Sequence, residues 1–286
     1  MNNILEIENL VKNYPDFSLN HIKLSIPQGT IMGLIGENGA GKTTTIDLIL
    51  NEIKRDGGTI KIFGKDNIQC EREIKDKIGV IFDDCHFPDL FNALELERFL
   101  KPIYTEWQSS TYREYLKRFG LPNNKPIKAY SKGMKVKLSF AVALSHCPQF
   151  LILDEATSGL DPVMRDEILD VLLEFVQDES HSVLFSSHIT NDLEKIADYV
   201  AFLHKGNLVF NKPKDELLYK YGLMKCGAEV FNSIQRQDIL AWRKLDYEWQ
   251  VLVADIEAAR RKYKKCIIEN ATIEEIMLLY IKGEKR

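Results

Sequence analysis

The chain has 286 residues, and its 38 Lys and Arg residues against 42 Asp and Glu residues give a formal net charge of −4. A general nucleic-acid-binding protein relies on a basic excess to neutralise phosphates, so this balance argues against nucleic acid as a partner. Hydrophobic residues make up 45% and charged residues 28%, which excludes a disordered chain and favours one large globular domain or two smaller ones.

The predicted strands fall into two kinds. Residues alternate between apolar and polar in His21–Ile26 and in Thr59–Gly64, which is typical of half-exposed strands. Nearly continuous apolar runs occur at Thr30–Gly36, Phe150–Glu155 and Ser182–His188. Such runs favour strands that are covered on both faces, as in a parallel sheet.

Helical patterns dominate the middle of the chain. The strand signal is absent from about Phe87 to Cys147, where leucines between Leu90 and Leu100 follow helical spacing. The segment Pro162–Gln177 predicts an amphipathic helix with proline in its first turn. A hairpin is expected around the turn at 205–206.

The pattern changes again past Asp215, where short strand signals precede a final helix in the last part of the chain. We therefore expect a core made of residues 1–84 and 147–215, a helical subdomain of residues 85–146, and a C-terminal accessory domain of residues 216–286. The core is expected to carry an antiparallel β subdomain, and the accessory domain to be a small α/β unit.

No membrane span, signal peptide or disulfide framework is expected. The longest uncharged stretch, Leu138–Leu153, is too short and too polar for a bilayer core that needs about 20 apolar residues. The N-terminal residues have neither a basic start nor an apolar run before the first acid. The five cysteines lie far apart without a C-x-x-C pair, so they predict neither structural disulfides nor a zinc site. A cytosolic protein with reduced cysteines is the expectation.

The strongest motif is GENGAGKT, which fits G-x-x-x-x-G-K-[ST] and lies between a predicted strand and a predicted helix. Its glycines permit turns that aim backbone N–H groups at phosphates, and the following helix adds its positive end. Lys42 is expected to reach the β- and γ-phosphates, and Thr43 to bind Mg²⁺. The predicted nucleotide-binding residues are Gly36, Glu37, Asn38, Gly39, Ala40, Gly41, Lys42, Thr43 and Thr44. The fold class expected is therefore an α/β P-loop NTPase.

Two further sites follow buried strands. Asp154 and Glu155 end the run FLILDE, and a carboxylate at that place is costly unless it meets a cation such as Mg²⁺. We expect Asp154 to hold the metal and Glu155 to act as the base that polarises the attacking water. His188 ends the next such run and is a candidate contact to the γ-phosphate, although a capped polar side chain also fits that pattern.

The order of these motifs resembles the ATP-binding subunits of ABC transporters up to about Asp215. The resemblance implies that Tyr14 stacks on adenine, which a tyrosine face permits, whereas an ordinary half-buried strand tyrosine explains it equally well. The family signature, usually LSGGQ, corresponds to YSKGM, in which Ser131 and Gly133 are retained. Ser131 also has the character of a helix N-cap.

The same resemblance implies a head-to-tail dimer with ATP and Mg²⁺ at its interface, in which the signature of one copy meets the γ-phosphate held by the other. Asp161, in SGLDP, is the expected contact of the loop that crosses this interface. Asp83 stands where the family usually carries a glutamine that touches Mg²⁺ and the membrane subunit. An acid there can still bind the metal or its water.

The closest similarity is to ATPases of ABC-2 type exporters, supported by YSKGMK, by Trp107 and by the ending IEEIMLLYIKGE. The function expected from it is an ATPase at the cytoplasmic face of the membrane that powers export of a peptide or antibiotic-like compound through a separate transmembrane permease. The alternative is a soluble ABC ATPase that acts on ribosomes, nucleic acid or another complex. Because ribosome-acting members usually carry two cassettes and one motif set is present here, the transporter is favoured.

Overall fold

The computed structural model describes residues 2–264 and 266–284. The chain forms two compact units. The first contains the chain up to Ala197 together with Leu203–Val209, and the second contains Asp198–Phe202 and the chain from Phe210 onward. The hairpin of β9 (Tyr199–His204) and β10 (Asn207–Pro213) is divided between the two units.

A parallel sheet forms the centre of the first unit. Strand β3 pairs with β8, β8 with β7 and β7 with β6, all in parallel register. Every residue of β3, β7 and β8 is buried, which confirms the prediction that their continuous apolar runs are covered on both faces. The bounds of these strands are β3 (Ile31–Ile35), β6 (Ile78–Phe82), β7 (Phe150–Asp154) and β8 (Ser182–Ser187).

An antiparallel sheet with the strand order β2-β1-β4-β5 completes the strands of the first unit. Its alternating burial follows the sequence alternation, with Leu24 and Ile26 buried on β2 and Ile60 and Ile62 buried on β4. The bounds are β1 (Asn3–Tyr14), β2 (Phe17–Pro27), β4 (Gly57–Ile62) and β5 (Lys65–Asp66).

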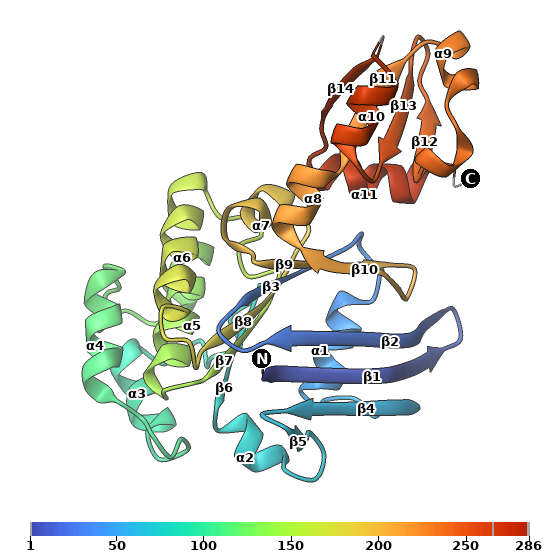
Figure 1. Ribbon diagram of the computed structural model, residues 1–286. Helices are drawn as coiled ribbons and strands as arrows, with labels where there is room; N and C mark the ends of the chain where they lie inside the picture. Colours follow the sequence, from blue (N-terminus) through green and yellow to red (C-terminus); the bar gives the residue numbers. More distant parts are fainter. Residues whose placement is uncertain (1, 265, 285–286) are drawn as a thin grey trace. The chain divides into compact units, whose positions relative to one another are not determined.

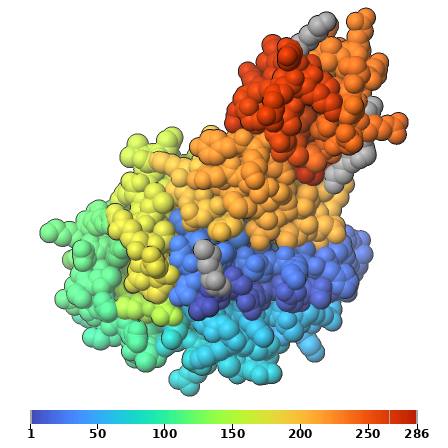
Figure 2. All heavy atoms as spheres, viewed as in Figure 1, coloured from blue at the N-terminus to red at the C-terminus, as the bar shows by residue number. Residues whose placement is uncertain are grey.

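Helices complete the first unit. In Figure 1, strands β6, β7 and β8 lie between the blue antiparallel sheet and the green helices α4 and α5. Figure 2 shows the green residues of α3 and α4 as a lobe beside the yellow residues of α6. The bounds are α1 (Lys42–Ile49), α2 (Glu71–Lys75), α3 (Ala93–Leu100), α4 (Ser109–Arg118), α5 (Lys132–Ser145), α6 (Pro162–Phe175) and α7 (Thr190–Ile196).

The inclusion of Leu90 in the helical leucine pattern was wrong. Helix α3 begins after Asn92, whose side chain accepts hydrogen bonds from the backbone N–H groups of Leu94 and Glu95. The carboxylate of Glu95 accepts from the Asn92 backbone in return, and this capping box sets the start of the helix. Leu90 therefore precedes the helix, and 74% of its surface is exposed.

The second unit has a four-stranded antiparallel sheet with the strand order β12-β13-β11-β14. Its core includes Met224, Phe231, Val251, Ile256 and Ile268. The bounds are α8 (Lys214–Lys220), β11 (Gly222–Cys226), α9 (Ala228–Ser233), β12 (Ala241–Lys244), β13 (Trp249–Val253), α10 (Ile256–Lys262), β14 (Ile267–Asn270) and α11 (Ile273–Lys282). Over the described part of the chain, no helix combines the length and apolarity that a membrane crossing requires.

Candidate nucleotide site

The loop between β3 and α1 carries the GENGAGKT motif. At two of its glycines, Gly36 and Gly41, the surrounding structure leaves no space for a side chain. A Cβ on Gly36 would lie 2.5 Å from the Leu203 carbonyl oxygen, so a side chain there would collide with backbone. Gly41 has φ of 109°, a value that L side chains rarely adopt, and a Cβ there would lie 2.6 Å from Leu19 Cδ2. The motif thus wraps tightly before α1 begins at Lys42.

Lys42 places a buried cation inside this loop, with 6% of its surface exposed. Its Nζ donates to the carbonyl oxygens of Gly36 at 2.8 Å and Glu37 at 3.3 Å. Glu155 Oε1 lies 3.2 Å from the same nitrogen. Because these contacts hold the ammonium group against the loop, its charge is fixed where the phosphates of a nucleotide would lie.

Thr43 and Asp154 meet although they are far apart in the sequence. Thr43 Oγ1 donates to Asp154 Oδ2 at 2.8 Å, from the first turn of α1 to the end of β7. The other carboxylate oxygen, Asp154 Oδ1, is buried and has no hydrogen-bond partner among the described residues. A buried carboxylate oxygen without a donor is costly unless a cation or water satisfies it.

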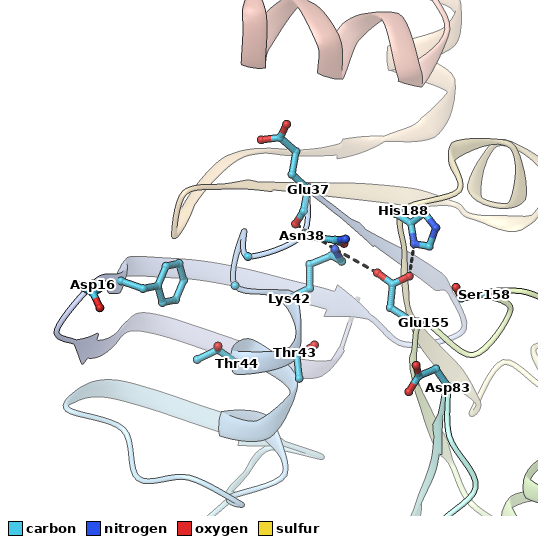
Figure 3. A pocket seen from close by; sticks show the side chains of 13 residues that line it. Asp16, Glu37, Asn38, Lys42, Thr43, Thr44, Asp83, Glu155, Ser158 and His188 are labelled. Carbon is cyan, nitrogen blue, oxygen red and sulfur yellow. Dashed lines mark hydrogen bonds and ion pairs between the residues drawn. The ribbon is translucent and has the colours of Figure 1, made fainter.

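Glu155 lies between two basic side chains, as Figure 3 shows with dashed lines to Lys42 and His188. Its Oε2 is hydrogen-bonded to His188 Nδ1. The backbone of Glu155 has φ of 53°, a strained value for a residue other than glycine that is common at functional sites. Its N–H donates to the Ser186 carbonyl oxygen at 3.1 Å, which ties this turn to β8.

Two further acids help to arrange the site. Asp192, on α7, is buried and accepts from Thr157 Oγ1 at 3.0 Å, so it joins the loop after Glu155 to the segment after His188. Burial raises the pKa of Asp192. Burial also raises the pKa of Asp47, and the negative charge of Asp154 adds to that effect. Both carboxyl groups are therefore protonated more readily than an exposed aspartate, and Arg165 Nε lies 3.8 Å from Asp192 Oδ2.

A cavity of about 660 Å³ is lined by Lys42, Thr43, Glu155 and His188, whereas Asp154 is not part of the lining and is hydrogen-bonded to Thr43. Its volume suits a nucleotide-sized ligand, and its lining combines backbone, one lysine and several acids. The lining residues are Asp16, Phe17, Glu37, Asn38, Gly39, Gly41, Lys42, Thr43, Thr44, Asp83, Glu155, Ser158 and His188. Asp16, Phe17 and Ser158 are the members of this lining that the motifs did not predict.

The sequence matches a family model described as ABC transporter over residues 19–158. It is 35% identical over 220 residues to the bacitracin transport ATP-binding protein BcrA of Bacillus licheniformis, covering 76% of this chain and 72% of that protein. The chain belongs to the ABC transporter family, as an ATP-binding protein. It is therefore an ATPase that powers transport.

Other ABC proteins resemble it along different parts of the chain. The lantibiotic transport ATP-binding protein SrtF of Streptococcus pyogenes is 34% identical over 217 residues, covering 74% of this chain and 92% of that protein. The ABC transporter ATP-binding protein YtrB of Bacillus subtilis is 27% identical over 278 residues and covers 94% of both chains. The solved structure of an ATP-binding subunit of an ABC transporter superposes with a TM-score of 0.68 and 25% identity, covering 75% of this chain and 91% of that one.

The residues of the ABC signature lie outside the cavity lining. Ser131 caps α5, and its Oγ accepts from the Met134 backbone N–H at 3.2 Å. Gly133 allows close packing of α5, because a Cβ there would lie 2.3 Å from the sulfur of Met164 on α6. Ser131 is exposed, so the capped start of α5 is open to a ligand or to another molecule.

Of the other residues that the sequence predicted for the nucleotide site, some line the cavity and others lie outside its lining. Asp83, after β6, lines the cavity. Asp161 does not, and it caps α6 by accepting from the backbone N–H groups of Val163 at 3.1 Å and Met164 at 3.0 Å. Ala40 lies in the loop but is buried, and its carbonyl oxygen accepts from the Gly206 N–H.

Tyr14 and Phe17 flank the turn between β1 and β2, with ring centroids 6.5 Å apart. Phe17 lines the cavity, whereas Tyr14 is absent from the lining and 41% exposed. We therefore expect Phe17→Ala to weaken the binding of AMP, ADP and ATP alike by about 1–3 kcal/mol, the magnitude of one base stacked on a ring. Tyr14→Ala is expected to have a smaller effect. Titration of both variants with fluorescent adenine nucleotides checks this order, and a larger loss in Tyr14→Ala would restore Tyr14 as the adenine platform.

Proposed function

We propose that the chain hydrolyses Mg²⁺-ATP to power export of a peptide antibiotic through a separate transmembrane subunit at the cytoplasmic face of the membrane. It does so as a head-to-tail dimer. The observation that carries the catalytic part is the cavity lined by Lys42, Thr43 and Glu155, together with the hydrogen bond that joins Thr43 to Asp154.

Mg²⁺ fits the residues at the end of β7. Thr43 Oγ1 and the partnerless Asp154 Oδ1 are hard oxygen donors, the type that Mg²⁺ prefers. Among the described residues, no group of three His, Cys, Asp or Glu side chains is placed to hold a metal without other ligands. That arrangement suits Mg²⁺, which usually takes one or two protein ligands along with phosphates and water. When bound, the metal would neutralise charge on the β- and γ-phosphates.

Asp154→Asn tests the metal role. The amide keeps the size of the side chain but loses the negative charge, so we expect the Mg²⁺ concentration for half-maximal ATPase activity to rise roughly 10- to 100-fold. Asp166→Asn is the matched control, because it makes the same chemical change in an exposed ion pair with Lys195 and Asp166 does not line the cavity. Equal Mg²⁺ dependence in Asp154→Asn and the parent protein would contradict the assignment.

The dimer proposal rests on the exposed, capped start of α5. Helix N-termini bind anions through free N–H groups and the helix dipole, so Ser131 at this cap suits the γ-phosphate of ATP held by a second copy. Lys132 replaces the usual glycine of the signature and adds a positive charge in the first turn. Asp161 comes three residues after Ser158, which lines the cavity, and it caps α6. This position suits a loop at the proposed dimer interface.

The first unit of the chain has a surface on which the permease could dock. A cavity of about 520 Å³ is lined by Leu50, Glu52, Lys75, Ile78, Val80, Phe82 and His86. Most of these side chains are apolar, and Phe82 directly precedes Asp83 of the nucleotide cavity. A permease segment in this groove would contact β6 at the strand end that leads into the ATP site.

The cargo is inferred from the relatives. BcrA and SrtF are named for transport of bacitracin and a lantibiotic, which are peptide antibiotics. They share about a third of their residues with this chain over three-quarters of its length. The ribosome-acting alternative gains no support from these relatives.

Purification from detergent-solubilised membranes tests the proposal. We expect a permease to copurify with the tagged chain and to be identified by mass spectrometry. Cells that express both are expected to resist bacitracin or a lantibiotic, and cells that express Lys42→Ala with the permease are expected to lose that resistance. Copurification with ribosomes, without any membrane protein, would contradict the proposal.

A further inference from the structure

Two of the five free cysteines lie at the ends of paired strands in the second unit, Cys226 as the last residue of β11 and Cys266 directly before β14. Strand β11 pairs antiparallel with β14, and the register runs from Gly222 opposite Asn270 to Lys225 opposite Ile267. The paired residues end there, because β14 begins at Ile267, and continuing the same register by one residue puts Cys226 across from Cys266. Figure 1 shows β11 and β14 as neighbours in the sheet.

Both cysteine side chains belong to the core-facing side of this pair of strands. Met224 lies opposite Ile268, and both are buried in the core of the unit. Side chains two residues apart on a strand share a face, which puts Cys226 on the side of Met224 and Cys266 on the side of Ile268. Both cysteines pack against that same core cluster, as this geometry requires.

The spacing of such a pair suits a covalent link. Residues directly opposite in an antiparallel ladder have Cα atoms about 4.5–5.5 Å apart. A disulfide bond requires Cα atoms about 4.4–6.8 Å apart, a range that includes this ladder spacing. Each cysteine is partly exposed, which leaves a small reagent access to the sulfur atoms.

We propose that Cys226 and Cys266 form a redox-active dithiol that a low-molecular-weight disulfide converts into a cross-strand disulfide bond. In the first step, the thiolate of one cysteine attacks the small disulfide, forms a mixed disulfide and releases one small thiolate. In the second step, the other cysteine attacks the protein sulfur of the mixed disulfide and releases the second small thiolate. Two protein thiols are thus oxidised, the small disulfide is reduced to two thiols, and the two protons pass to the released thiolates.

The protein environment sets the expected speed. Burial raises the pKa of the Cys226 thiol to about 11, and the neighbouring Cys266 adds to that effect. Burial also raises the pKa of Cys266. Because the thiolate is the reactive form, both steps are slow at neutral pH. The two cysteines therefore stay reduced unless the oxidant is present for a long time.

The test uses the full chain incubated with oxidised glutathione and then treated with an alkylating reagent. Peptide mapping without reductant is expected to find a Cys226–Cys266 crosslink within one chain, with the loss of two free thiols. Hydrogen exchange is expected to slow in β11 and β14 after oxidation, because the crosslink restrains strand separation. Dithiothreitol is expected to reverse both changes.

Two variants distinguish a pair of cysteines that react with each other from two cysteines that react independently. Cys226→Ser is expected to stop at a stable mixed disulfide on Cys266, whereas Cys70→Ser is expected to form the crosslink as the parent chain does. The mapping of the unsubstituted chain does not depend on the folding of either variant. Stable glutathione adducts on both cysteines of the parent chain, disulfides only between two chains, or no reaction at either cysteine would each overturn the proposal.

Discussion

Glu155→Gln is expected to lower the steady-state ATPase rate by about 10²- to 10⁴-fold, the usual contribution of a general base. The carboxylate lines the cavity directly after Asp154, the proposed metal ligand, and in the proposed mechanism it takes a proton from the attacking water. Glutamine has the same size and retains polar contacts toward Lys42 and His188, so ATP is expected to bind and remain. A closed dimer should then accumulate with ATP. Phosphate release and light scattering in the presence of Mg²⁺-ATP measure the two effects.

The control for this variant is Glu8→Gln, which makes the same chemical change in a surface ion pair with Lys23. It is expected to keep the parental ATPase rate. A parental rate in Glu155→Gln would show that another group activates the water. A slow rate without an ATP-dependent dimer would support the base assignment and count against the head-to-tail dimer.

The sequence was most informative where one physical requirement controls the local pattern. Strands β3, β7 and β8 are buried on both faces, and this requirement leaves the uninterrupted apolar runs by which they were predicted. The tight turns of the loop before α1 were also predictable, because Gly36 and Gly41 stand where a Cβ would collide or where φ is positive. A side chain at either place would disturb the loop, so glycine is required at both positions. The two glycines can therefore be recognised in the sequence by their spacing.

Strand β1 shows why other elements were missed. Its pairing with β2 has register shifts between Ile7 and Leu10 and between Leu10 and Lys12, and Asn9 has φ of 50°. These irregularities break the alternation of period two that marks a strand in the sequence. Because Phe17 follows this irregular strand across a tight turn, no sequence spacing indicated that its ring would line the cavity.

Contacts between distant residues were beyond the reach of local patterns. Thr157 and Asp192 join the segments that follow Glu155 and His188 through a hydrogen bond that no motif contains. Cys226 and Cys266 are distant in sequence, and the pairing of β11 with β14 brings the strand ends that carry them together. The expectation of isolated, reduced cysteines considered sequence spacing alone, whereas strand pairing determines which thiols are neighbours.

Lys42→Ala is expected to weaken ATP and ADP binding by about 1.5–3 kcal/mol, the value of a hydrogen bond to a charged group, or roughly 10- to 150-fold. The reason is that its Nζ is fixed against the loop by the carbonyl oxygens of Gly36 and Glu37 and has no other cation beside it in the cavity lining. Titration calorimetry with ATP, ADP and AMP measures the loss. AMP affinity is expected to change little, because AMP lacks the phosphates that the lysine contacts.

This contrast with AMP distinguishes a lost phosphate contact from a damaged fold. Phe17→Ala is expected to weaken all three nucleotides, whereas Lys42→Ala is expected to spare AMP. Lys23→Ala is the matched control, since Lys23 is 73% exposed and pairs with Glu8 at the surface. Removing Lys42 also leaves Glu155 with His188 as its basic partner in the cavity, so the ATPase rate should fall further than the affinity does. Unchanged ATP affinity in Lys42→Ala would contradict the phosphate-loop assignment, and an equal loss for AMP would show that the variant had disturbed the whole cavity.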